Sequence, residues 1–373
     1  IPRNIHKSAI NGLVLSGAIP IYIDPEIEPV MGISVGHSTK KVIATINKNP
    51  DAKAILLLNP TYYGFTCNLA EIIKHAHKKG LVVLVDESHG SHFYMDSRFG
   101  IPSMSIGADM ATISVHKTGG SLTQSSMLLH RNGLVSVNKA QSTINIMQTS
   151  SASYLLMASL DIARYHIATN PQLPKHVFDL ATYAKEKIKL IKGLSISEDS
   201  LLVNNELFHH DVSKLLIDVS KLGKTGNDIF NILKEEYDIQ VEVGESRIVL
   251  VIISIGDTIE DINHLIDSLQ KISDRLYNEN PVAIARRKYF HPIAVMSPRD
   301  AFFSDTEYIP IRESEGRIAG DQIMIYPPGI PLLVPGEVIT KGIITEYVRL
   351  IKQGNKVIGS TLNGKIKIRV IKE

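Results

Sequence analysis

The stretch Leu81-Val82-Val83-Leu84-Val85-Asp86-Glu87-Ser88-His89-Gly90 decides the fold. It opens with a continuous apolar run of strand length, which ends abruptly at Asp86. A short apolar run followed by polar turn residues is typical of a strand buried on both faces, as in a parallel sheet. A second run, Ala111 to Val115, ends as abruptly in His116-Lys117-Thr118-Gly119-Gly120. We therefore expect two strands of one mostly parallel sheet.

The segment before Leu81 predicts a strand followed by a helix. Ala54 to Leu58 has the pattern of a buried strand, and the turn residues Asn59-Pro60-Thr61 follow it. Asn68 suits a helix N-cap, with Glu71 completing a capping-box pattern, and Gly80 suits the C-terminal end. One face of this helix is apolar through Leu69, Ile72, Ile73 and Ala76. Alternating strands and helices predict βα units, and hence an α/β fold class.

After about Ala168 the sequence changes character and indicates a smaller α+β domain. Apolar runs predict strands and periodic segments predict helices, at Leu215–Val219, Ile229–Tyr237, Ile239–Val243, Val249–Ile253 and a helix with Ile259, Ile262, Leu265, Ile266, Leu269 and Ile272 on one face. A charged stretch from Asp274 to Arg287, broken by Pro281, is predicted to be a linker. The end of the chain predicts an alternating strand through Ile366, Ile368 and Val370.

Composition excludes several classes of protein. The 373 residues are 44% hydrophobic and 21% charged, and the net charge is +2, so nothing demands a nucleic-acid partner. The longest apolar runs, such as Ile248 to Ile253, are far shorter than the roughly 20 residues of a membrane-spanning helix. The single cysteine, Cys67, fits a reducing compartment, and we expect a cytoplasmic protein. The sequence opens at Ile1-Pro2 without a secretory leader, so we expect a segment upstream.

Asp86 and Lys117 are the residues that carry chemistry. Both follow predicted parallel strands, and ligands of open α/β sheets bind beside the carboxyl ends of the strands. A partly desolvated lysine offers a neutral amine that can form a Schiff base, and a buried aspartate is the natural partner of a protonated pyridine nitrogen. Together they favour pyridoxal 5'-phosphate as cofactor. Nearby hydroxyls suit its phosphate, namely Ser114, Thr118, Ser121, Thr123, Ser125 and Ser126.

The pattern alone leaves other interpretations open. An aspartate at a strand end is most often a cap or turn residue, and a lysine after a strand usually lies at the surface. Asp86, His89 and His92 could instead hold a metal ion, although they match no known metal-site motif. His92 fits a structural histidine equally well, and His6 alone would be taken for a surface residue.

Four segments resemble the bacterial ornithine/lysine/arginine decarboxylases, in their short form without an N-terminal wing domain. They are Arg3-Asn4-Ile5-His6-Lys7-Ser8, Val85 to Phe93, Ser114 to Ser125, and Tyr326-Pro327-Pro328-Gly329-Ile330-Pro331 with Pro335-Gly336-Glu337. The resemblance implies a fold type I pyridoxal phosphate enzyme. It divides the chain into a cofactor-binding major domain (1–170, incomplete at its N-terminus), a small α+β domain (171–275) and a C-terminal decarboxylase domain (276–373).

The resemblance also implies roles for single residues. Lys117 is the Schiff-base lysine, Asp86 the partner of the pyridine nitrogen, and His6 stacks on the ring. His89 lies near the ring hydroxyl, while Ser114 and His116 help to hold the phosphate. Thr149 and Ser150 belong to a stretch that reaches the phosphate of a neighbouring subunit, which implies a homodimer or higher homo-oligomer with shared sites. Metal ligands are not expected.

Family members carry an upstream Pro-Gly-His-Lys segment and a Gly-Thr/Ser-rich phosphate loop, and residues 1–373 include neither. We therefore expect a fragment of a longer gene product or a truncated protein.

The implied activity is α-decarboxylation of a basic amino acid, a carboxy-lyase reaction that feeds polyamine metabolism. Arginine, giving agmatine, is the first choice of substrate, and lysine, giving cadaverine, is the second. The cationic side chain needs an acidic partner, and the candidates are Glu242, Asp305, Glu313, Glu315 and Glu337. The alternatives are another fold type I reaction, such as aminotransfer or elimination, and a truncated chain that acts only in dimerisation or regulation.

Overall fold

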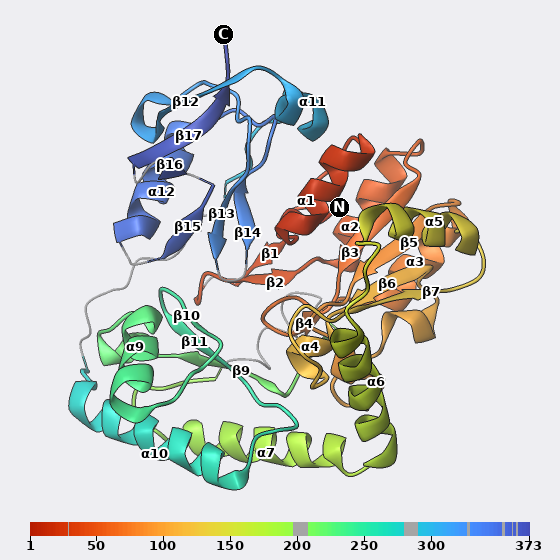
Figure 1. Ribbon diagram of the computed structural model, residues 1–373. Helices are drawn as coiled ribbons and strands as arrows, with labels where there is room; N and C mark the ends of the chain where they lie inside the picture. Colours follow the sequence, from red (N-terminus) through yellow and green to blue (C-terminus); the bar gives the residue numbers. More distant parts are fainter. Residues whose placement is uncertain are drawn as a thin grey trace. The chain divides into compact units, whose positions relative to one another are not determined.

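The computed structural model describes residues 1–28, 30–196, 208–279, 290–326, 329–352, 355–359, 361–362 and 365–373 (Figure 1). The chain divides into two compact units. The larger is Glu26–Ile284, and the smaller joins Ile1–Pro25 to Ala285–Glu373. The expected division at residues 170 and 275 remains a prediction.

The central sheet of the larger unit has the strand order β3-β5-β6-β7 in the described residues. Strands β3 (Ala54–Leu58), β5 (Val82–Asp86) and β6 (Met110–Ile113) are parallel, and β7 (Met127–His130) is an antiparallel edge strand. Leu58 pairs with Asp86 and Asp86 with Thr112, so the carboxyl ends of the three parallel strands lie level. The prediction of a mostly parallel sheet in an α/β fold is confirmed.

Helix α3 (Leu69–Lys78) forms as its sequence predicts. The Asn68 side chain accepts a hydrogen bond from the Glu71 amide, while Leu69, Ile72, Ile73 and Ala76 are buried. Gly80 has a φ of 74°, the left-handed conformation that a glycine adopts easily after a helix. Further elements complete this part of the unit, namely β1 (Glu26–Ile27), β2 (Ser34–Gly36), α2 (Thr39–Lys48), β4 (Phe65–Thr66), α4 (Val115–Thr118), α5 (Val137–Met147), α6 (Tyr154–Thr169) and β8 (His209–His210).

A separate antiparallel sheet of order β10-β11-β9 occurs in the described part of the larger unit. Its strands are β9 (Lys214–Asp218), β10 (Val243–Gly244) and β11 (Ile248–Ile252), and the helices are α7 (Leu173–Ile188), α9 (Gly226–Tyr237) and α10 (Ile259–Leu276). One apolar cluster joins β9, β11 and all three helices. Backbone passes so close to Gly226 that a Cβ there would lie 1.9 Å from the Ile248 carbonyl oxygen, which only glycine avoids.

The smaller unit combines helices with two antiparallel sheets in its described residues, of order β12-β17-β16 and β14-β13-β15. Its elements are α1 (Lys7–Ser16), α11 (Pro298–Phe303), β12 (Thr306–Pro310), β13 (Ile323–Tyr326), β14 (Ile330–Leu333), α12 (Lys341–Lys352), β15 (Lys356–Ile358), β16 (Thr361–Leu362) and β17 (Lys365–Ile371). Short 3-10 helices occur in both units, at Ser91–Tyr94, Ser103–Ile106, Ser220–Leu222 and Ile311–Glu313. A buried ion pair joins Arg3 to Glu337 at 2.8 Å and fixes the start of the chain against the turn after β14.

Three local predictions need correction. Val115 was expected to end a strand, but it begins α4, because the chain turns at Ser114 to bring the following residues onto the sheet edge. Of the strand expected at Ile239–Val243, only Val243 is paired, since the preceding residues cross from α9 to the sheet. The linker expected from Asp274 starts within α10, which continues to Leu276. The rest of that linker, from residue 280 onward, lies outside the described residues.

None of the described helices is both long and apolar enough to cross a membrane.

Candidate active site

Asp86 and Lys117 lie at the same edge of the central sheet. Asp86 is the last residue of β5, and Lys117 lies in the short helix α4 that follows the neighbouring strand β6. The Asp86 carboxylate accepts hydrogen bonds from the Ser88 amide at 3.2 Å and the Ser88 hydroxyl at 2.6 Å. These bonds hold a charged oxygen at the strand end, where the sequence predicts it.

The Lys117 amine lies 3.0 Å from Nε2 of His89. The side chain reaches solvent, but its amine lies among protein groups, and this desolvation lowers the pKa of Lys117 below its ordinary value. The negative charges of Asp86 and Glu242 oppose that shift. A lysine with a lowered pKa presents more neutral amine, the form that attacks a carbonyl.

His89 lies between two lysines. Its Nδ1 is 3.1 Å from the amine of Lys214, a side chain with no exposed surface, and its ring meets the Tyr62 ring edge-on at 5.1 Å. Sequence reasoning missed Lys214, because the strand was expected to begin one residue later, at Leu215. A cation at the start of an otherwise apolar run was the available signal.

Asp211 is a buried acidic residue whose charge interacts with that of Lys214. Burial opposes ionisation of Asp211, but His92 and Lys214 lower its pKa through their charge, with hydrogen bonds from His92 and Ser213. His92 Nε2 lies 2.7 Å from the Asp211 carboxylate, so His92 has a structural partner. Glu242 accepts a hydrogen bond of 2.8 Å from the Tyr62 hydroxyl. Since His89 and His92 have different partners, Asp86, His89 and His92 form no metal site in the described residues.

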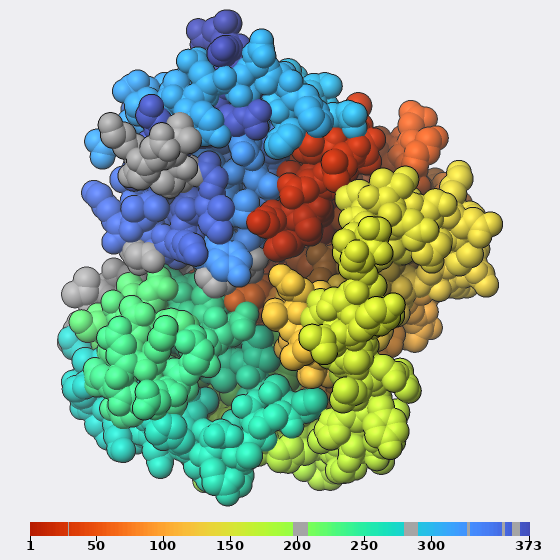
Figure 2. Space-filling model, in the orientation of Figure 1, coloured from red at the N-terminus to blue at the C-terminus, as the bar shows by residue number. Residues whose placement is uncertain are grey.

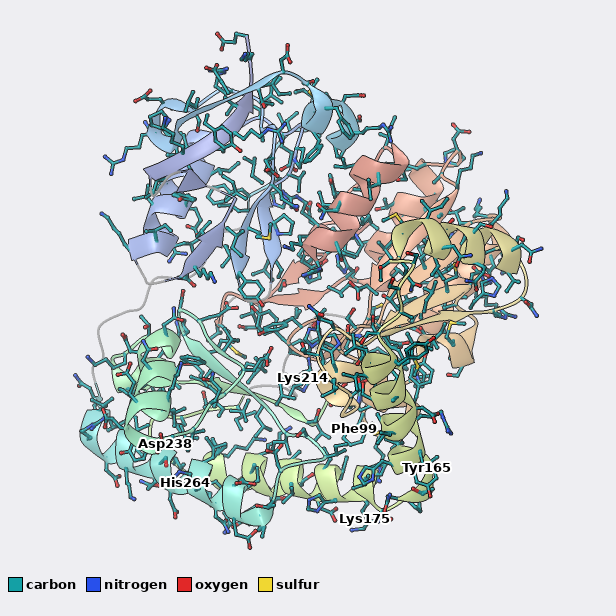
Figure 3. All side chains as sticks on the ribbon, viewed as in Figure 1. Phe99, Tyr165, Lys175, Lys214, Asp238 and His264 are labelled. Atoms are coloured by element: carbon teal, nitrogen blue, oxygen red, sulfur yellow. The ribbon has the colours of Figure 1, made fainter. Side chains whose placement is uncertain are left out.

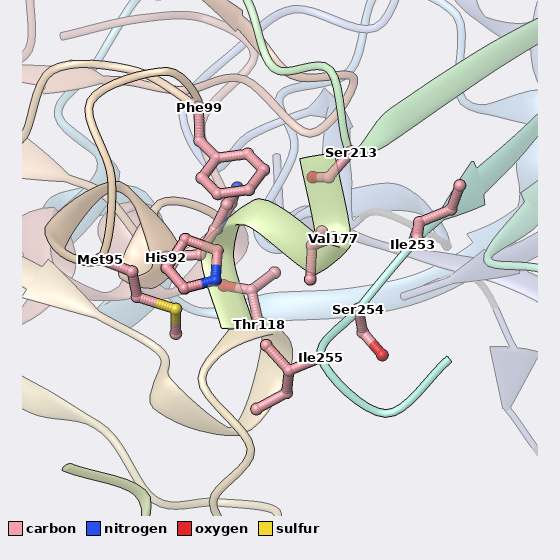
Figure 4. A pocket seen from close by; sticks show the side chains of 10 residues that line it. His92, Met95, Phe99, Thr118, Val177, Ser213, Ile253, Ser254 and Ile255 are labelled. Carbon is pink, nitrogen blue, oxygen red and sulfur yellow. The ribbon is translucent and has the colours of Figure 1, made fainter. Parts of the chain in front are cut away.

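A small pocket lies beside α4 (Figure 4). His92, Phe99 and Thr118 line one side of it, and Val177 with Ile253 to Ile255 line the other. His92 Nδ1 is buried here without a hydrogen-bond partner among the residues that the structure describes. The lining is mostly apolar, so this space is part of the packing under α4 and too small for the cofactor.

The predicted phosphate residues lie in the loop around α4. Ser114 precedes the first residue of α4, and its side chain makes no capping hydrogen bond. His116 donates from Nδ1 to the Ser125 carbonyl at 2.7 Å, which folds the loop back onto the helix. Gly120, with a φ of 84°, allows the turn between them.

The remaining predicted residues are not brought to Lys117 within the larger unit. Thr149 and Ser150 are exposed between α5 and α6. His6 belongs to the smaller unit, where its Nδ1 lies 2.9 Å from the Ser8 hydroxyl and its ring faces Gly329. The acidic candidates Asp305, Glu313, Glu315 and Glu337 are in the smaller unit, and Glu337 is already paired with Arg3. Pro327 and Pro328 of the predicted Pro-Pro-Gly segment lie outside the described residues.

The residues at this edge fit pyridoxal phosphate. A lysine amine with a lowered pKa suits its aldehyde, and the carboxylate at the end of β5 suits its ring nitrogen. His89 lies between the phenyl edge of Tyr62 and the Lys117 amine, where a flat ring could be contacted. No cation-binding cluster competes for the same place among the described residues.

Comparisons with known proteins identify the family of this chain. The Orn/Lys/Arg decarboxylase major domain matches residues 1–261, and the C-terminal domain of the same family matches residues 283–358. Arginine decarboxylase of Halalkalibacterium halodurans is 42% identical over 378 residues, covering 100% of this chain and 77% of that protein. Arginine decarboxylase of Bacillus subtilis is 40% identical over 377 residues, with the same coverage.

A solved structure shares the fold. Lysine decarboxylase A from Pseudomonas aeruginosa superposes with a TM-score of 0.82 at 21% identity, over 100% of this chain and 66% of that one. This chain therefore spans just under two thirds of that larger protein. The expected fold type I architecture and the expected family are both confirmed. The chain belongs to the Orn/Lys/Arg decarboxylase family.

Proposed function

We propose that this chain is a pyridoxal phosphate-dependent arginine decarboxylase that converts arginine to agmatine and carbon dioxide. The relatives named arginine decarboxylase match the whole chain at about 40% identity. The observation that carries the chemistry is the Lys117 amine, 3.0 Å from His89 at the edge of the sheet that also holds Asp86. Lysine is the second candidate substrate, because similar folds occur in lysine decarboxylases.

Each residue has a distinct task in this proposal. When bound, pyridoxal phosphate withdraws electrons from the substrate α-carbon, so that the bond to the carboxylate carbon can break. Lys117 supplies the amine that holds the cofactor, and the Asp86 carboxylate keeps a proton on the ring nitrogen. Lys117 or His89 returns a proton to the α-carbon, since both reach the same edge. Ser114 and His116, and His6 from the smaller unit, remain proposed contacts to the phosphate and the ring.

The proposal is tested by the absorbance spectrum of the purified chain with added pyridoxal phosphate, followed by carbon dioxide release. Arginine, lysine and ornithine are supplied in parallel at the same concentrations. We expect a shifted cofactor band and release from arginine well above release from the other two. Release of carbon dioxide from lysine alone would identify lysine, and not arginine, as the substrate. A colourless protein that releases no carbon dioxide would contradict the proposal and favour a non-catalytic chain.

We further propose that the protein is a homodimer formed through α5 and α6. In α5 no residue is buried, and in α6 only Ala163 is, although both helices carry large apolar side chains. Ile146, Tyr154 and Leu155 are each about four fifths exposed, and Tyr165 projects outward from α6 (Figure 3). Figure 2 shows these helices, in yellow and yellow-green, on the visible surface of the molecule. An apolar surface of this kind marks an interface.

A second copy suits this surface because Thr149 and Ser150 lie within it, between α5 and α6. In the proposed arrangement these hydroxyls contact the cofactor phosphate of the partner subunit. The cytoplasm remains the proposed location, and the single cysteine, Cys67, is free and buried.

Charged substitutions on this surface should separate the subunits. We expect the double variant Ile146→Glu with Leu155→Glu to be a monomer, because two carboxylates would be desolvated in the interface. We also expect its affinity for pyridoxal phosphate to fall about tenfold or more, as a contact to the phosphate is lost. Sedimentation velocity gives the mass, and fluorescence titration gives the affinity.

Leu190→Glu is the matched control, since Leu190 is 80% exposed at the end of α7, away from this surface. It should leave the mass unchanged. A double variant that stays dimeric would show that the copies meet elsewhere.

A further inference from the structure

An open cavity of about 420 Å³ lies in the larger unit, at the edge of the central sheet opposite to Lys117. Its walls are α3, the short 3-10 helix that precedes β6, and the chain just after β7 (Figure 1). Strand β7 runs antiparallel to β6, and its last residue, His130, pairs with Met110, the first residue of β6. The cavity therefore lies at the amino ends of the parallel strands, whereas Asp86 and Lys117 lie at their carboxyl ends.

The cavity is lined by basic and apolar side chains. Lys74, His77 and Arg131 are its basic residues, and Ile73 and Ile106 belong to its apolar wall. None of the described residues that line it is acidic. Its volume falls within the range of about 300 to 1,000 Å³ that is typical of small-molecule sites. A ligand that suits this lining carries negative charge on one part and has an apolar body.

Hydrogen bonds to one buried residue hold the wall of the cavity in place. The Asp109 carboxylate lies 2.9 Å from Nε2 of His77 and accepts a hydrogen bond of 2.8 Å from the Val83 amide. The Asp109 carbonyl oxygen accepts another, at 2.9 Å, from the Arg131 amide. Asp109 thus fixes α3, β5 and the chain after β7 relative to one another. It lies outside the lining, so a bound anion would contact Lys74 and Arg131 instead.

The Arg131 guanidinium is anchored but not neutralised. Its Nη1 donates to the Gly107 carbonyl oxygen at 2.9 Å. A Cβ on Gly107 would lie 3.2 Å from the same nitrogen, so glycine leaves the space that the guanidinium needs. The exposed arginines Arg98 and Arg275 each pair with a carboxylate at 2.7 Å. Among the residues that the structure describes, neither Arg131 nor Lys74 has such a partner.

We propose that this cavity binds a phosphate monoester, with the phosphate on Arg131 and Lys74 and the organic group against Ile73 and Ile106. The planar guanidinium matches two phosphate oxygens at once, and the ammonium adds a second positive charge. A phosphate monoester carries a charge of about −1.5 to −2 near pH 7, which suits two cations better than the single charge of a carboxylate. The inference goes beyond the proposed function, because the cavity shares no residue with the site around Lys117.

Phenyl phosphate is the probe for this site, because it joins a dianion to a small apolar ring. It is titrated by calorimetry into the full chain at constant ionic strength. Inorganic phosphate, which lacks the ring, and phenyl sulfate, which has the same shape with a single charge, are titrated in parallel. We expect phenyl phosphate to bind about tenfold more tightly than either. Equal binding of inorganic phosphate would overturn the assignment to an ester, and equal binding of phenyl sulfate would overturn the contact with two cations.

The double variant Lys74→Gln with Arg131→Gln should bind phenyl phosphate about tenfold more weakly or worse, because both positive charges are lost. Both side chains are exposed, so the fold should survive, which circular dichroism checks. Lys175→Gln with Arg275→Gln is the matched control, since these are exposed cations elsewhere in the larger unit. The control should keep the wild-type affinity. Unchanged affinity of the first double variant would overturn the proposal, and so would an equal loss in the control.

The wild-type chain allows a test that locates the ligand without any variant. Phenylglyoxal modifies accessible arginine side chains, and mass spectrometry of the peptides measures the rate at each position. Phenyl phosphate at ten times its Kd should slow modification of Arg131 about tenfold, by mass action. Arg275, whose side chain is 47% exposed, should react as before. If Arg131 stayed unprotected where the titration shows binding, the ligand would bind elsewhere and the proposal would be wrong.

Discussion

Replacing Lys117 with alanine is expected to lower decarboxylation of arginine by about 10⁴-fold or more, the scale of losing a covalent catalytic group. Alanine removes the amine at the end of α4, and the described residues offer Lys214 as the other amine on His89. Lys214 is fully buried and held by the Tyr62 carbonyl, so it cannot take over. The measurement is carbon dioxide release, with the absorbance spectrum of the same sample.

The absorbance spectrum shows whether a variant is inactive because the cofactor no longer attaches to Lys117 or because the protein is misfolded. Lys117→Ala should show the band of free pyridoxal phosphate, and borohydride should fix no cofactor to the protein. Lys175→Ala, on the exposed face of α7, should keep both band and turnover. Turnover retained by Lys117→Ala would refute the assignment of this lysine.

Replacing Asp86 with asparagine is expected to lower turnover by about 10² to 10³-fold while the cofactor still attaches to Lys117. The amide has nearly the same shape, but it carries no charge to hold a proton on the ring nitrogen. The substitution also removes a negative charge that raises the pKa of Lys117. Acetylation of the Lys117 amine by acetic anhydride, in the protein without cofactor, should therefore become slightly faster. Steady-state kinetics and the cofactor spectrum are measured together.

Asp96→Asn is the control for this change. Asp96 is another aspartate near a turn, where it pairs with the exposed Arg98, and its loss should leave turnover unchanged. If Asp86→Asn bound no cofactor, Asp86 would be needed for binding, and its proposed role in turnover would be wrong. Unchanged turnover would also contradict that role.

Local sequence signals predicted the elements that place the site. Residues Ala54 to Leu58 form β3 with the predicted bounds, because an apolar run with a turn after it leaves little choice of structure. Helix α3 begins after Asn68 for the same local reason. The level ends of β5 and β6 then follow from parallel pairing, which brings Asp86 and the α4 segment to one edge.

Contacts between distant segments could not be predicted this way. Lys214 lies at the start of β9, and the fold brings it to His89, which is 125 residues away in the sequence. No pattern in the sequence around Lys214 indicates that contact. Val115 was placed in a strand because its apolar side chain fits a strand or a buried helix turn equally well. The reaction was predicted from the motifs around Lys117 that resemble a known family. Hydrophobic periodicity predicts strands and helices but not a reaction.

The buried pair between Arg3 and Glu337 also sets an order of events during synthesis. The partners are 334 residues apart, so the segment around Arg3 is synthesised long before the residue with which it pairs. At translation rates of about 5–20 residues per second this delay lasts on the order of tens of seconds. The larger unit, contiguous from Glu26 to Ile284, is complete well before then. During synthesis the larger unit can therefore fold while the apolar residues Ile5 and Ile10, buried in the finished protein, still lack the C-terminal part of their own unit.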